Sequence, residues 1–448
     1  MIRRPGRRAP DPDEQIERME RVVRERVDSG RSTGIAAGMV LQDGRTHCFA
    51  YGDPGQGRRI DEHSVFEIGS ITKVFTGTLL AQMAQRGELA LTDPVTTLLP
   101  PGVSLPSRGG RQITLLDLAT HASGLPRLPV NMAPAEEANP YADYSVEAMY
   151  ELLAGYVLTR DPGAKYEYSN LGAGLLGHVL ALRAGTSYEE LVRERILRPL
   201  GMASTAITIT GEMAQRFACG HDVTGRVVSH WDLPTLAGAG ALRSSVGDML
   251  RFAQANLGVN IDGDGDGSLR RALAATHAPR KRIGLGMRIG LNWHVLGYRS
   301  NTLLMHDGGT AGFCSFIGVD RARRTATVVL SNSAAESVAD IGIHVINERA
   351  RLTPPPKPRT AITLPAARLE RYVGVYEADG ITVEITRTRD GLSAQVAGIA
   401  TRLYPEAETR FFARAPDAQV VFKLASGGMA TGALLRQAGQ KTRFKKVG

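Results

Sequence analysis

Apolar residues recur with a helical period near the start of the chain and with a strand period directly afterwards. Five of them share one helical stripe between residues 12 and 28, namely Ile16, Met19, Val22, Val23 and Val27. The segments 34–42 and 46–51 have the pattern of strands, and Gln42-Asp43-Gly44 between them is a turn sequence. The pattern therefore predicts a helix followed by a β-hairpin.

Helical stretches and Pro/Gly-rich loops fill the middle of the chain, and strands return near residue 313. Helices are predicted over residues 70–86 (with Gly87 as C-cap), 171–184, 187–198 and 336–351. Strands rich in β-branched residues are predicted over 313–319 and 325–331. Because strands lie at both ends of a mainly helical region, we expect one sheet built from the two ends, with a helical insert.

A proline-rich segment, Pro354-Pro355-Pro356-Lys357-Pro358, divides the chain. It is stiff and extended, and we take residues 353–361 as a linker. Seven short strands separated by Gly and Asp-Gly turns are predicted beyond it: 371–376, 381–387, 392–397, 400–404, 410–414, 419–424 and 431–435. The expected organisation is a basic flexible N-terminus (1–11), a large domain (12–352) and a small all-β barrel or sandwich (362–448).

Composition narrows the functional classes. With 43% apolar and 22% charged residues, the 448-residue chain is typical of globular proteins. The net charge is +9, but the basic residues are dispersed and only 6% of residues are aromatic, so neither a nucleic-acid partner nor a membrane is expected. Three cysteines give no disulfide framework, and no apolar stretch follows the N-terminal arginines, so we expect a cytoplasmic protein.

A candidate nucleophile opens the helix predicted over residues 70–86. In Ser70-Ile71-Thr72-Lys73, the spacing of three places the lysine beside the serine on one helix face. A serine hydroxyl needs a base to become a nucleophile, and a lysine whose pKa is lowered by burial can be that base. Taken alone, the motif is more typical of an N-cap serine followed by a solvent-facing lysine.

Two further motifs carry suitable chemistry. Tyr168-Ser169-Asn170 offers a phenol that can shuttle a proton and an amide that can bind both a lysine and a substrate carbonyl. The segment His306-Asp307-Gly308-Gly309 precedes the predicted strand 313–319, so its backbone could bind a peptide or complete an oxyanion hole. Taken alone, the first motif is typical of an ordinary loop Tyr and Asn, and His306 is equally typical of a hydrogen-bonded histidine at the end of a strand.

The three motifs, in this order, resemble the serine β-lactamase, penicillin-binding-protein and D-aminopeptidase superfamily, nearest its class C branch. Three more segments are similar to that family: 118–125, 199–202 and 238–245. The resemblance spans roughly residues 12–350. It implies an α+β fold, with an antiparallel sheet flanked by helices and a helical subdomain. The segment 369–376 in turn resembles the start of the small lipocalin-like β domains that follow the catalytic domain in several members.

The resemblance also implies the roles of the site residues. Ser70 would attack, Lys73 and Tyr168 would handle protons, and Asn170 would orient the substrate and Lys73. His306 would line the opposite wall, with Asp307 and Gly308 beside the substrate. The N–H groups of Ser70 and Gly309 would form the oxyanion hole. No cofactor and no metal are implied.

Two features depart from known patterns. Where the family carries Lys-Thr-Gly to hold a substrate carboxylate, this chain has His306-Asp307-Gly308, and Asp307 would repel a carboxylate. We therefore expect neither a true β-lactamase nor a D-Ala-D-Ala carboxypeptidase. The segment 262–267 opens like a calcium-binding loop, but the twelfth position is Leu273 instead of glutamate, which indicates a solvated acidic turn.

Several functions share such a site. The chain is similar to the penicillin-binding-protein-type thioesterases, which take a nonribosomal peptide from an acidic carrier protein and release it as a ring. The positive net charge and the predicted β domain favour the hypothesis that this chain is such a peptide cyclase. The alternatives are a D-amino-acid peptidase or amidase, a class C-like esterase or β-lactamase, and a catalytically silent penicillin-binding-like sensor. The expected partner is a peptidyl substrate, and the sequence does not indicate an oligomeric state.

Overall fold

The chain forms two compact units, residues 1–352 and 353–448. The computed structural model describes residues 11–55, 57–261, 263–284, 286–298, 301–355, 359–378, 381–389, 391–396, 399–413, 418–437 and 440–447. Of the predicted basic N-terminus, only Asp11 lies within this set. Each unit has its own hydrophobic core.

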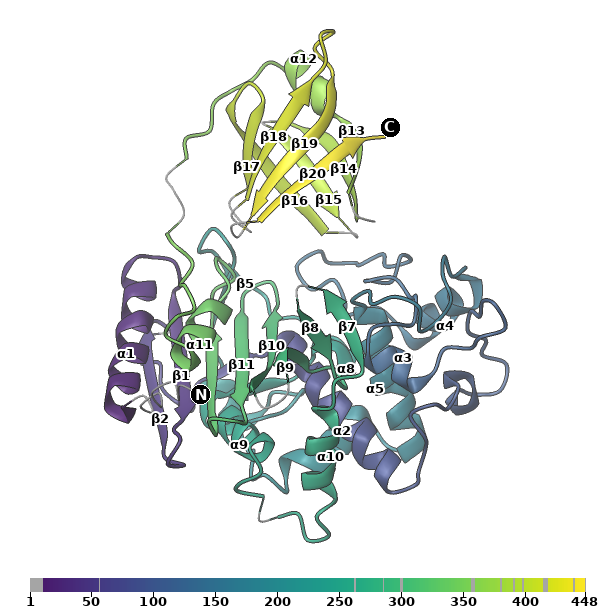
Figure 1. Cartoon of the computed structure of the whole chain (residues 1–448), viewed down its shortest axis with the longest axis vertical. Helices are drawn as coiled ribbons and strands as arrows, with labels where there is room; N and C mark the ends of the chain where they lie inside the picture. The colour runs from purple at the N-terminus through teal and green to yellow at the C-terminus, as the bar shows by residue number, and fades with distance from the viewer. Residues whose placement is uncertain are drawn as a thin grey trace, which may run out of the picture. The chain divides into compact units, whose positions relative to one another are not determined.

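An eight-stranded antiparallel sheet forms the centre of the first unit, in the order β2-β1-β12-β11-β10-β9-β8-β7 (Figure 1). Its strands are β1 (Gly34–Val40), β2 (Thr46–Gly52), β7 (Lys281–Gly284), β8 (Met287–Ile289), β9 (His294–Tyr298), β10 (Asn301–Gly309), β11 (Cys314–Asp320) and β12 (Thr325–Ser331). Strand β1 pairs with β12, which joins the two ends of the unit. The predicted sheet with a helical insert is thus confirmed.

The segment His306-Asp307-Gly308-Gly309 precedes the strand β11, as the sequence predicted, but the sequence did not predict that the segment itself belongs to a strand. These residues lie inside β10, paired with β11 from Leu303↔Asp320 to Gly309↔Cys314. The turn comes later, where the Thr310 N–H donates to the Phe313 carbonyl at 3.0 Å. Pairing with β11 overrides the turn propensity of the Asp-Gly-Gly segment, whereas the pairing of β10 with β9 already ends at Met305.

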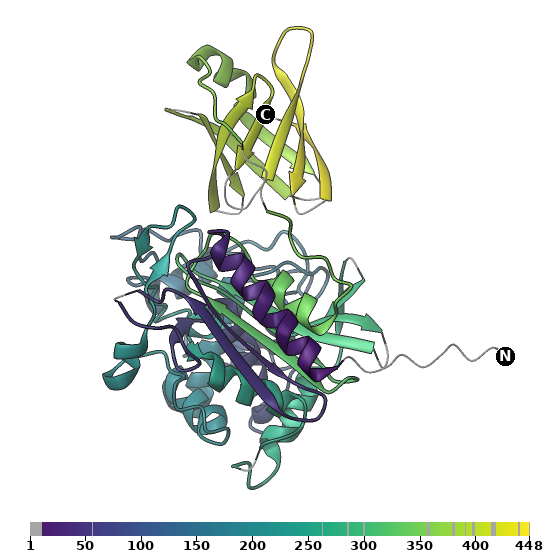
Figure 2. The same cartoon turned by 90° about the vertical axis from the view of Figure 1, so that its left-hand side faces the viewer.

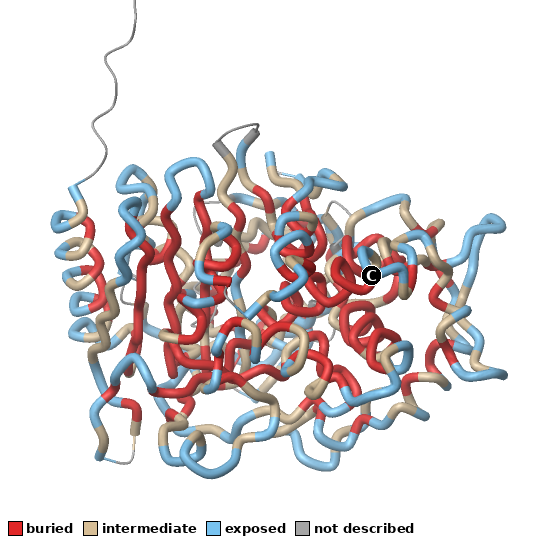
Figure 3. Tube along the Cα trace, turned by 90° about the horizontal axis from the view of Figure 1, so that it is seen from below, coloured by how far each residue is buried: buried red, intermediate tan, exposed pale blue. Residues whose placement is uncertain are grey.

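Helices cover both faces of the sheet. On one face, α1 (Pro12–Asp28) and α11 (Ala339–Ile346) pack over it, and Figure 2 shows α1 in purple lying across the strands. On the other face lies α9 (Val246–Asn256), which contacts β1 and β12. Helix α11 is shorter than the predicted 336–351 because Asn347 leaves the helical conformation. In Figure 3 the central strands and helices are red and the outer loops pale blue.

The helical insert surrounds a buried central helix, α2 (Thr72–Gln85), which contacts α10 (Ser268–Thr276), α8 (Ala237–Gly240) and α5 (Asn170–Ala184). Shorter helices complete the insert: α3 (Leu115–Ala119), α4 (Val146–Gly155), α6 (Tyr188–Val192) and α7 (Gly211–Arg216). The predicted helix 187–198 is α6 continued by a π-helical turn, Arg193–Leu197. No helix of the described residues is both long enough and apolar enough to cross a bilayer.

The second unit is a closed barrel of eight strands. They are β13 (Gly374–Ala378), β14 (Ile381–Thr388), β15 (Gly391–Val396), β16 (Ile399–Ala407), β17 (Arg410–Ala413), β18 (Ala418–Leu424), β19 (Ala430–Gln437) and β20 (Gln440–Lys446). Strand β20 pairs with β13 and closes the barrel. The sequence predicted seven strands and missed β20, whose side chains alternate between exposed cations (Lys441, Arg443, Lys445) and the buried Phe444. Aromatic residues, including Tyr372, Tyr376, Phe411 and Phe422, fill the barrel core.

Candidate active site

Ser70 lies in a tight turn at the entrance of α2. The turn is a single 3-10 segment, Gly69–Ile71, between β3 (Val65–Glu67) and α2. Gly69 has φ +49°, and a Cβ there would lie 2.8 Å from the Gly309 amide nitrogen. A residue without a side chain is therefore required at this position, and the backbone of the turn packs directly against β10.

Lys73 is fully buried, and its Nζ lies 2.9 Å from Ser70 Oγ. A second contact, 2.6 Å to the Ala239 carbonyl oxygen, anchors Nζ to α8. Burial lowers the pKa of Lys73 well below its ordinary value, and the Arg127 guanidinium lowers it further. A lowered pKa makes the neutral amine more accessible, and in that form Nζ could keep one N–H on Ala239 and offer its lone pair to the Ser70 proton, as a general base does. The alternative of an N-cap serine with an exposed lysine is excluded, because Ile71 is the N-cap residue of α2.

Tyr168 is the third member of this group. Its phenol lies near enough to Ser70 for that side chain to act on the pKa of the phenol, and its ring centroid lies 5.0 Å from Lys73 Nζ. Burial raises the pKa of Tyr168, so the phenol keeps its proton. The site thus pushes the pKa values of an amine and a phenol in opposite senses, which suits the predicted roles of Lys73 as a base and Tyr168 as a proton donor; both roles stay predictions.

Asn170 begins α5 directly after the N-cap Ser169 and lines the same cleft as Ser70 and Gly309. We expected it to hold Lys73 as well as substrate. The contacts of Nζ go to Ser70 and Ala239 instead, and Asn170 Oδ1 is buried without a hydrogen-bond partner among the described residues. The predicted role of Asn170 towards substrate stays a prediction.

His306 is buried in β10, with 1% of its surface exposed. Its Nδ1 lies 2.7 Å from the carbonyl oxygen of Asp307, so Nδ1–H donates and Nε2 is an acceptor. Burial, together with the neighbouring His294 and Lys73, lowers the pKa of His306 well below its ordinary value, so the ring is neutral. The His294 ring stacks on it at 5.0 Å. His306 therefore forms a polar but uncharged wall.

The next three residues of β10 differ in exposure and contacts. Asp307 is exposed, and its negative charge raises the pKa of Lys73 and of Tyr168, so it lies near the reacting groups. A Cβ on Gly308 would lie 2.1 Å from the Ile68 carbonyl oxygen, which shows how closely β10 crosses the nucleophile turn. Gly309 and Ser70 line one cleft, as two oxyanion donors must; their role as donors stays a prediction.

Sequence reasoning missed several groups around the site. His121, whose φ is +51°, accepts from the Ser169 N–H at Nδ1 (3.2 Å), and its ring centroid lies 4.4 Å from that of Tyr168. Tyr141 and Trp231 meet edge to face at 5.2 Å and form an aromatic wall of the cleft. His121 stands inside the segment 118–125 that resembles the family, but its φ above zero has no sequence signal. Ala239 contributes only a carbonyl, which any residue has.

The described residues contain no cluster of three or more His, Cys, Asp or Glu side chains that could hold a metal ion. Within the acidic segment 262–267, Asp262 lies outside the described residues. The carboxylates of Asp264 and Asp266 accept backbone N–H groups at the start of α10, including Leu269 N at 3.0 Å and Ser268 N at 2.8 Å. These aspartates therefore cap a helix.

Comparisons with known proteins agree with this arrangement. The family model described as Beta-lactamase matches residues 19–351, and one described as Domain of unknown function (DUF3471) matches residues 358–446. A D-alanyl-D-alanine-carboxypeptidase/endopeptidase of Escherichia coli (AmpH) is 31% identical over 301 residues, which are 64% of this chain and 76% of that protein. Penicillin-binding protein 4* of Bacillus subtilis is 26% identical over 405 residues, covering 84% of this chain and 87% of its own. That alignment is longer than the first unit, so it reaches into the barrel.

Solved structures give the same fold. A class C beta-lactamase superposes with a TM-score of 0.66 at 20% identity, covering 78% of this chain and 100% of that one. A beta-lactamase/D-alanine carboxypeptidase from Pseudomonas syringae gives 0.64 at 22% identity, covering 76% and 100%. The likeness is class C-like, as the three motifs indicated, and with the family match and the relatives it supports a serine acyl-enzyme hydrolase. The chain belongs to the beta-lactamase family.

Proposed function

We propose that this chain transfers peptidyl groups through an acyl-enzyme on Ser70, and that an amine of the peptide itself resolves that acyl-enzyme and closes a ring. The observation that carries the proposal is Asp307. It is an exposed carboxylate on β10, close enough to Lys73 and Tyr168 to shift their pKa values. A carboxylate there repels a substrate carboxylate and attracts an ammonium group. A peptide that cyclises brings such a group to its own acyl carbon.

The residues of the site balance each step. Ser70 Oγ attacks the carbonyl of a peptidyl thioester while Lys73 Nζ takes the hydroxyl proton. The carbon–sulfur bond then breaks, and Tyr168 donates its proton to the departing thiolate. The protonated Lys73 returns a proton to Tyr168, so both groups regain their starting state. In the second step the peptide amine attacks the ester and loses a proton to Lys73. The ester bond to Ser70 breaks, and the Ser70 oxygen takes the proton back from Lys73. The peptide is released with a new amide bond.

The barrel supports delivery by an acidic carrier protein. Residues 353–448 carry 15 of the 54 basic residues but only 8 of the 45 acidic ones, so most of the net charge of +9 lies in this unit. On β20 the exposed residues Lys441, Arg443 and Lys445 alternate with the buried Phe444, so they share the outer face of the barrel. Such a row of cations accelerates encounter with an acidic partner.

The test uses a linear peptidyl thioester that ends in a D-residue and has a free N-terminal amine, together with its N-acetylated twin. Products are read by mass spectrometry. We expect the free amine to give a product lighter by the thiol without added water, and the acetylated twin to give only linear acid. Linear acid from both substrates would overturn the proposal.

A D-amino-acid peptidase or amidase is the second candidate. It is favoured by the names of the relatives, which include a D-alanyl-D-alanine-carboxypeptidase/endopeptidase, and by Asp307, which could equally bind the ammonium group of an amino-terminal D-residue. Water would then resolve the acyl-enzyme. D-aminoacyl amides with a free amine distinguish this candidate, because they should be hydrolysed faster than their N-acetylated forms.

A further inference from the structure

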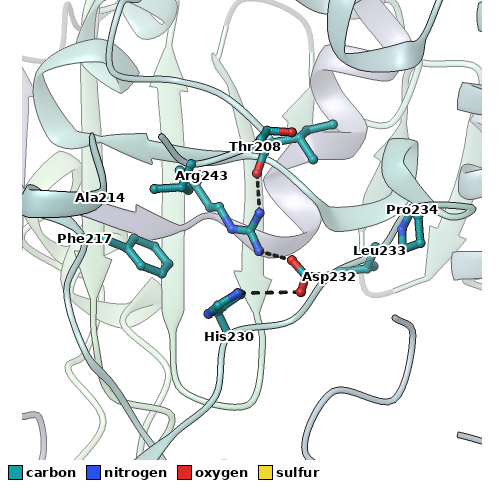
Figure 4. A pocket seen from close by; sticks show the side chains of 10 residues that line it. Thr208, Ala214, Phe217, His230, Asp232, Leu233, Pro234 and Arg243 are labelled. Carbon is teal, nitrogen blue, oxygen red and sulfur yellow. Dashed lines mark hydrogen bonds and ion pairs between the residues drawn. The ribbon is translucent and has the colours of Figure 1, made fainter. Parts of the chain in front are cut away.

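A second cavity adjoins the catalytic cleft. It has a volume of about 530 Å³ and is shown in Figure 4. Six apolar residues line it: Ile207, Ile209, Ala214, Phe217, Leu233 and Pro234. Leu233 also lines the cleft that contains Ser70, so the two spaces share a wall. The volume lies within the range of about 300–1,000 Å³ that is typical of small-molecule sites.

The charged groups at the edge of this apolar pocket are already engaged. Arg243 is 4% exposed, and its Nη2 lies 2.9 Å from Asp232 Oδ1 and 2.7 Å from the Trp231 carbonyl oxygen. Its Nη1 donates to the carbonyl of Ile207. Asp232 also accepts from Asn139 at 3.0 Å, and Figure 4 shows the Asp232 carboxylate between Arg243 and His230. A charged ligand would have to break these pairs, so the pocket suits an uncharged group.

The position of the proton donor decides which part of a substrate reaches this pocket. The carbonyl carbon must lie over Ser70 Oγ, and the leaving group must extend towards Tyr168, whose phenol lies near Ser70 and is the proposed proton donor. The other substituent of the carbonyl carbon, the acyl chain, then extends away from Tyr168. Trp231 and Leu233 line the cleft around Ser70, whereas Tyr168 is not one of its lining residues, and Leu233 is shared with the pocket.

We propose that the pocket binds the side chain of the residue that acylates Ser70 and selects bulky, uncharged, apolar side chains, either aliphatic or aromatic. This deepens the proposed function, on which it rests for the peptidyl nature of the acyl group. Complete burial of such a side chain corresponds to a preference of about 10- to 100-fold over alanine.

The test measures acylation of Ser70 by two thioesters, N-acetyl-D-phenylalanyl and N-acetyl-D-alanyl thiophenyl esters, from the first-turnover release of thiophenol. The wild-type protein should be acylated about 10- to 100-fold faster by the phenylalanyl ester. Ala214→Trp, which places an indole in the pocket from the exposed helix α7, should reduce that ratio at least tenfold. Thr208→Trp fills the pocket from its rim and should do the same.

Gln215→Trp is the matched control, since Gln215 is exposed on the same helix and does not line the pocket. It should leave both rate constants at the wild-type values. Equal wild-type rates for the two esters, or an unchanged ratio in folded Ala214→Trp and Thr208→Trp variants, would overturn the inference. The readout needs only acylation of Ser70, so it is independent of whether water or an amine resolves the acyl-enzyme. A failure of ring closure is thereby separated from a failure of the pocket.

Discussion

The two units of this chain treat buried polar groups in opposite ways. The first unit buries Lys73, His121 and His306 almost completely, and the Nε2 atoms of both histidines have no hydrogen-bond partner among the described residues. The barrel core consists of apolar and aromatic side chains, and the hydroxyl groups of its two buried tyrosines are paired: Tyr376 Oη donates to the Tyr372 carbonyl at 2.7 Å, and Tyr372 Oη donates to the Glu408 carbonyl. Among the described barrel residues only Thr388 Oγ1 is buried without a partner. Buried groups held at a cost to stability are typical of functional sites.

The two units also differ in their balance of basic and acidic residues. The first unit carries 39 basic and 37 acidic residues, whereas the barrel carries 15 and 8. Net charge says little about fold but much about association. The first unit thus has the features of a catalytic scaffold, and the barrel has those of a stable domain with a basic surface. Removing buried polar groups one at a time tests this contrast.

The largest effect is expected at Ser70. Ser70→Ala removes the only atom that can carry the acyl group, so covalent labelling by an activated ester should fall by at least about 10³-fold. Intact-protein mass spectrometry measures the labelled fraction. If the variant were labelled at the wild-type rate, the nucleophile would be a residue other than Ser70. The catalytic role given to the buried groups around Ser70 in the first unit would then be wrong.

Lys73 should control the pH dependence of acylation. Its pKa is lowered by burial from an ordinary value of 10.5, so the neutral base becomes more abundant as the pH rises, and the acylation rate should rise and level off well below pH 10.5. The pKa of Tyr168 is raised, so no falling limb should appear below pH 10. Lys73→Met should slow acylation by about 10²–10⁴-fold and remove the rise. A rise that persists in this variant would mean that another group is the base.

Lys73→Met also tests how much the burial of this lysine costs in the stability of the folded state. At neutral pH the unfolded chain binds a proton at Lys73 that the folded chain binds less well, so the lysine destabilises the folded state until the pH reaches about 10.5. Lys73→Met removes this penalty and fills a similar volume. We expect its melting temperature at pH 7 to equal or exceed that of the wild type, with the difference vanishing as the pH approaches 10.5. A marked drop would show that Lys73 also stabilises the fold.

A smaller loss of activity is expected from crowding the nucleophile turn. Gly69→Ala adds a Cβ that meets the Gly309 amide nitrogen at 2.8 Å, at a backbone angle that alanine disfavours. Displacing one oxyanion donor costs about 10²–10³-fold in turnover. Gly87→Ala is the control, since Gly87 has φ +70° and no atom near the position of its Cβ. If both variants lose activity equally, backbone strain and not the oxyanion hole explains the loss.

Local patterns in the sequence predicted much of this molecule. The spacing of Ser70 and Lys73 predicted their contact, because residues three apart on a helix share a face, and Nζ does lie 2.9 Å from Oγ. Two kinds of feature escaped. The short strands β7–β9 and the basic β20 form only by pairing with their neighbours. The partner of Lys73 is the Ala239 carbonyl instead of Asn170, and a backbone group that acts through tertiary packing has no sequence signature.

The smallest effect is expected in the barrel, and it completes the contrast with Lys73. Tyr376→Phe removes a hydroxyl that donates to the buried carbonyl of Tyr372, and that carbonyl then lacks a partner. We expect a loss of about 1 kcal/mol in the free energy of unfolding of the barrel, measured by denaturant titration. In the catalytic unit, replacing a buried polar group by an apolar one of similar size should leave stability unchanged or improved. In the barrel the same kind of change should destabilise, because the Tyr376 hydroxyl carries no charge whose burial costs stability, whereas Lys73 does, although it is also hydrogen-bonded. Equal effects of Lys73→Met and Tyr376→Phe on the stability of their units would show that the two cores follow one rule.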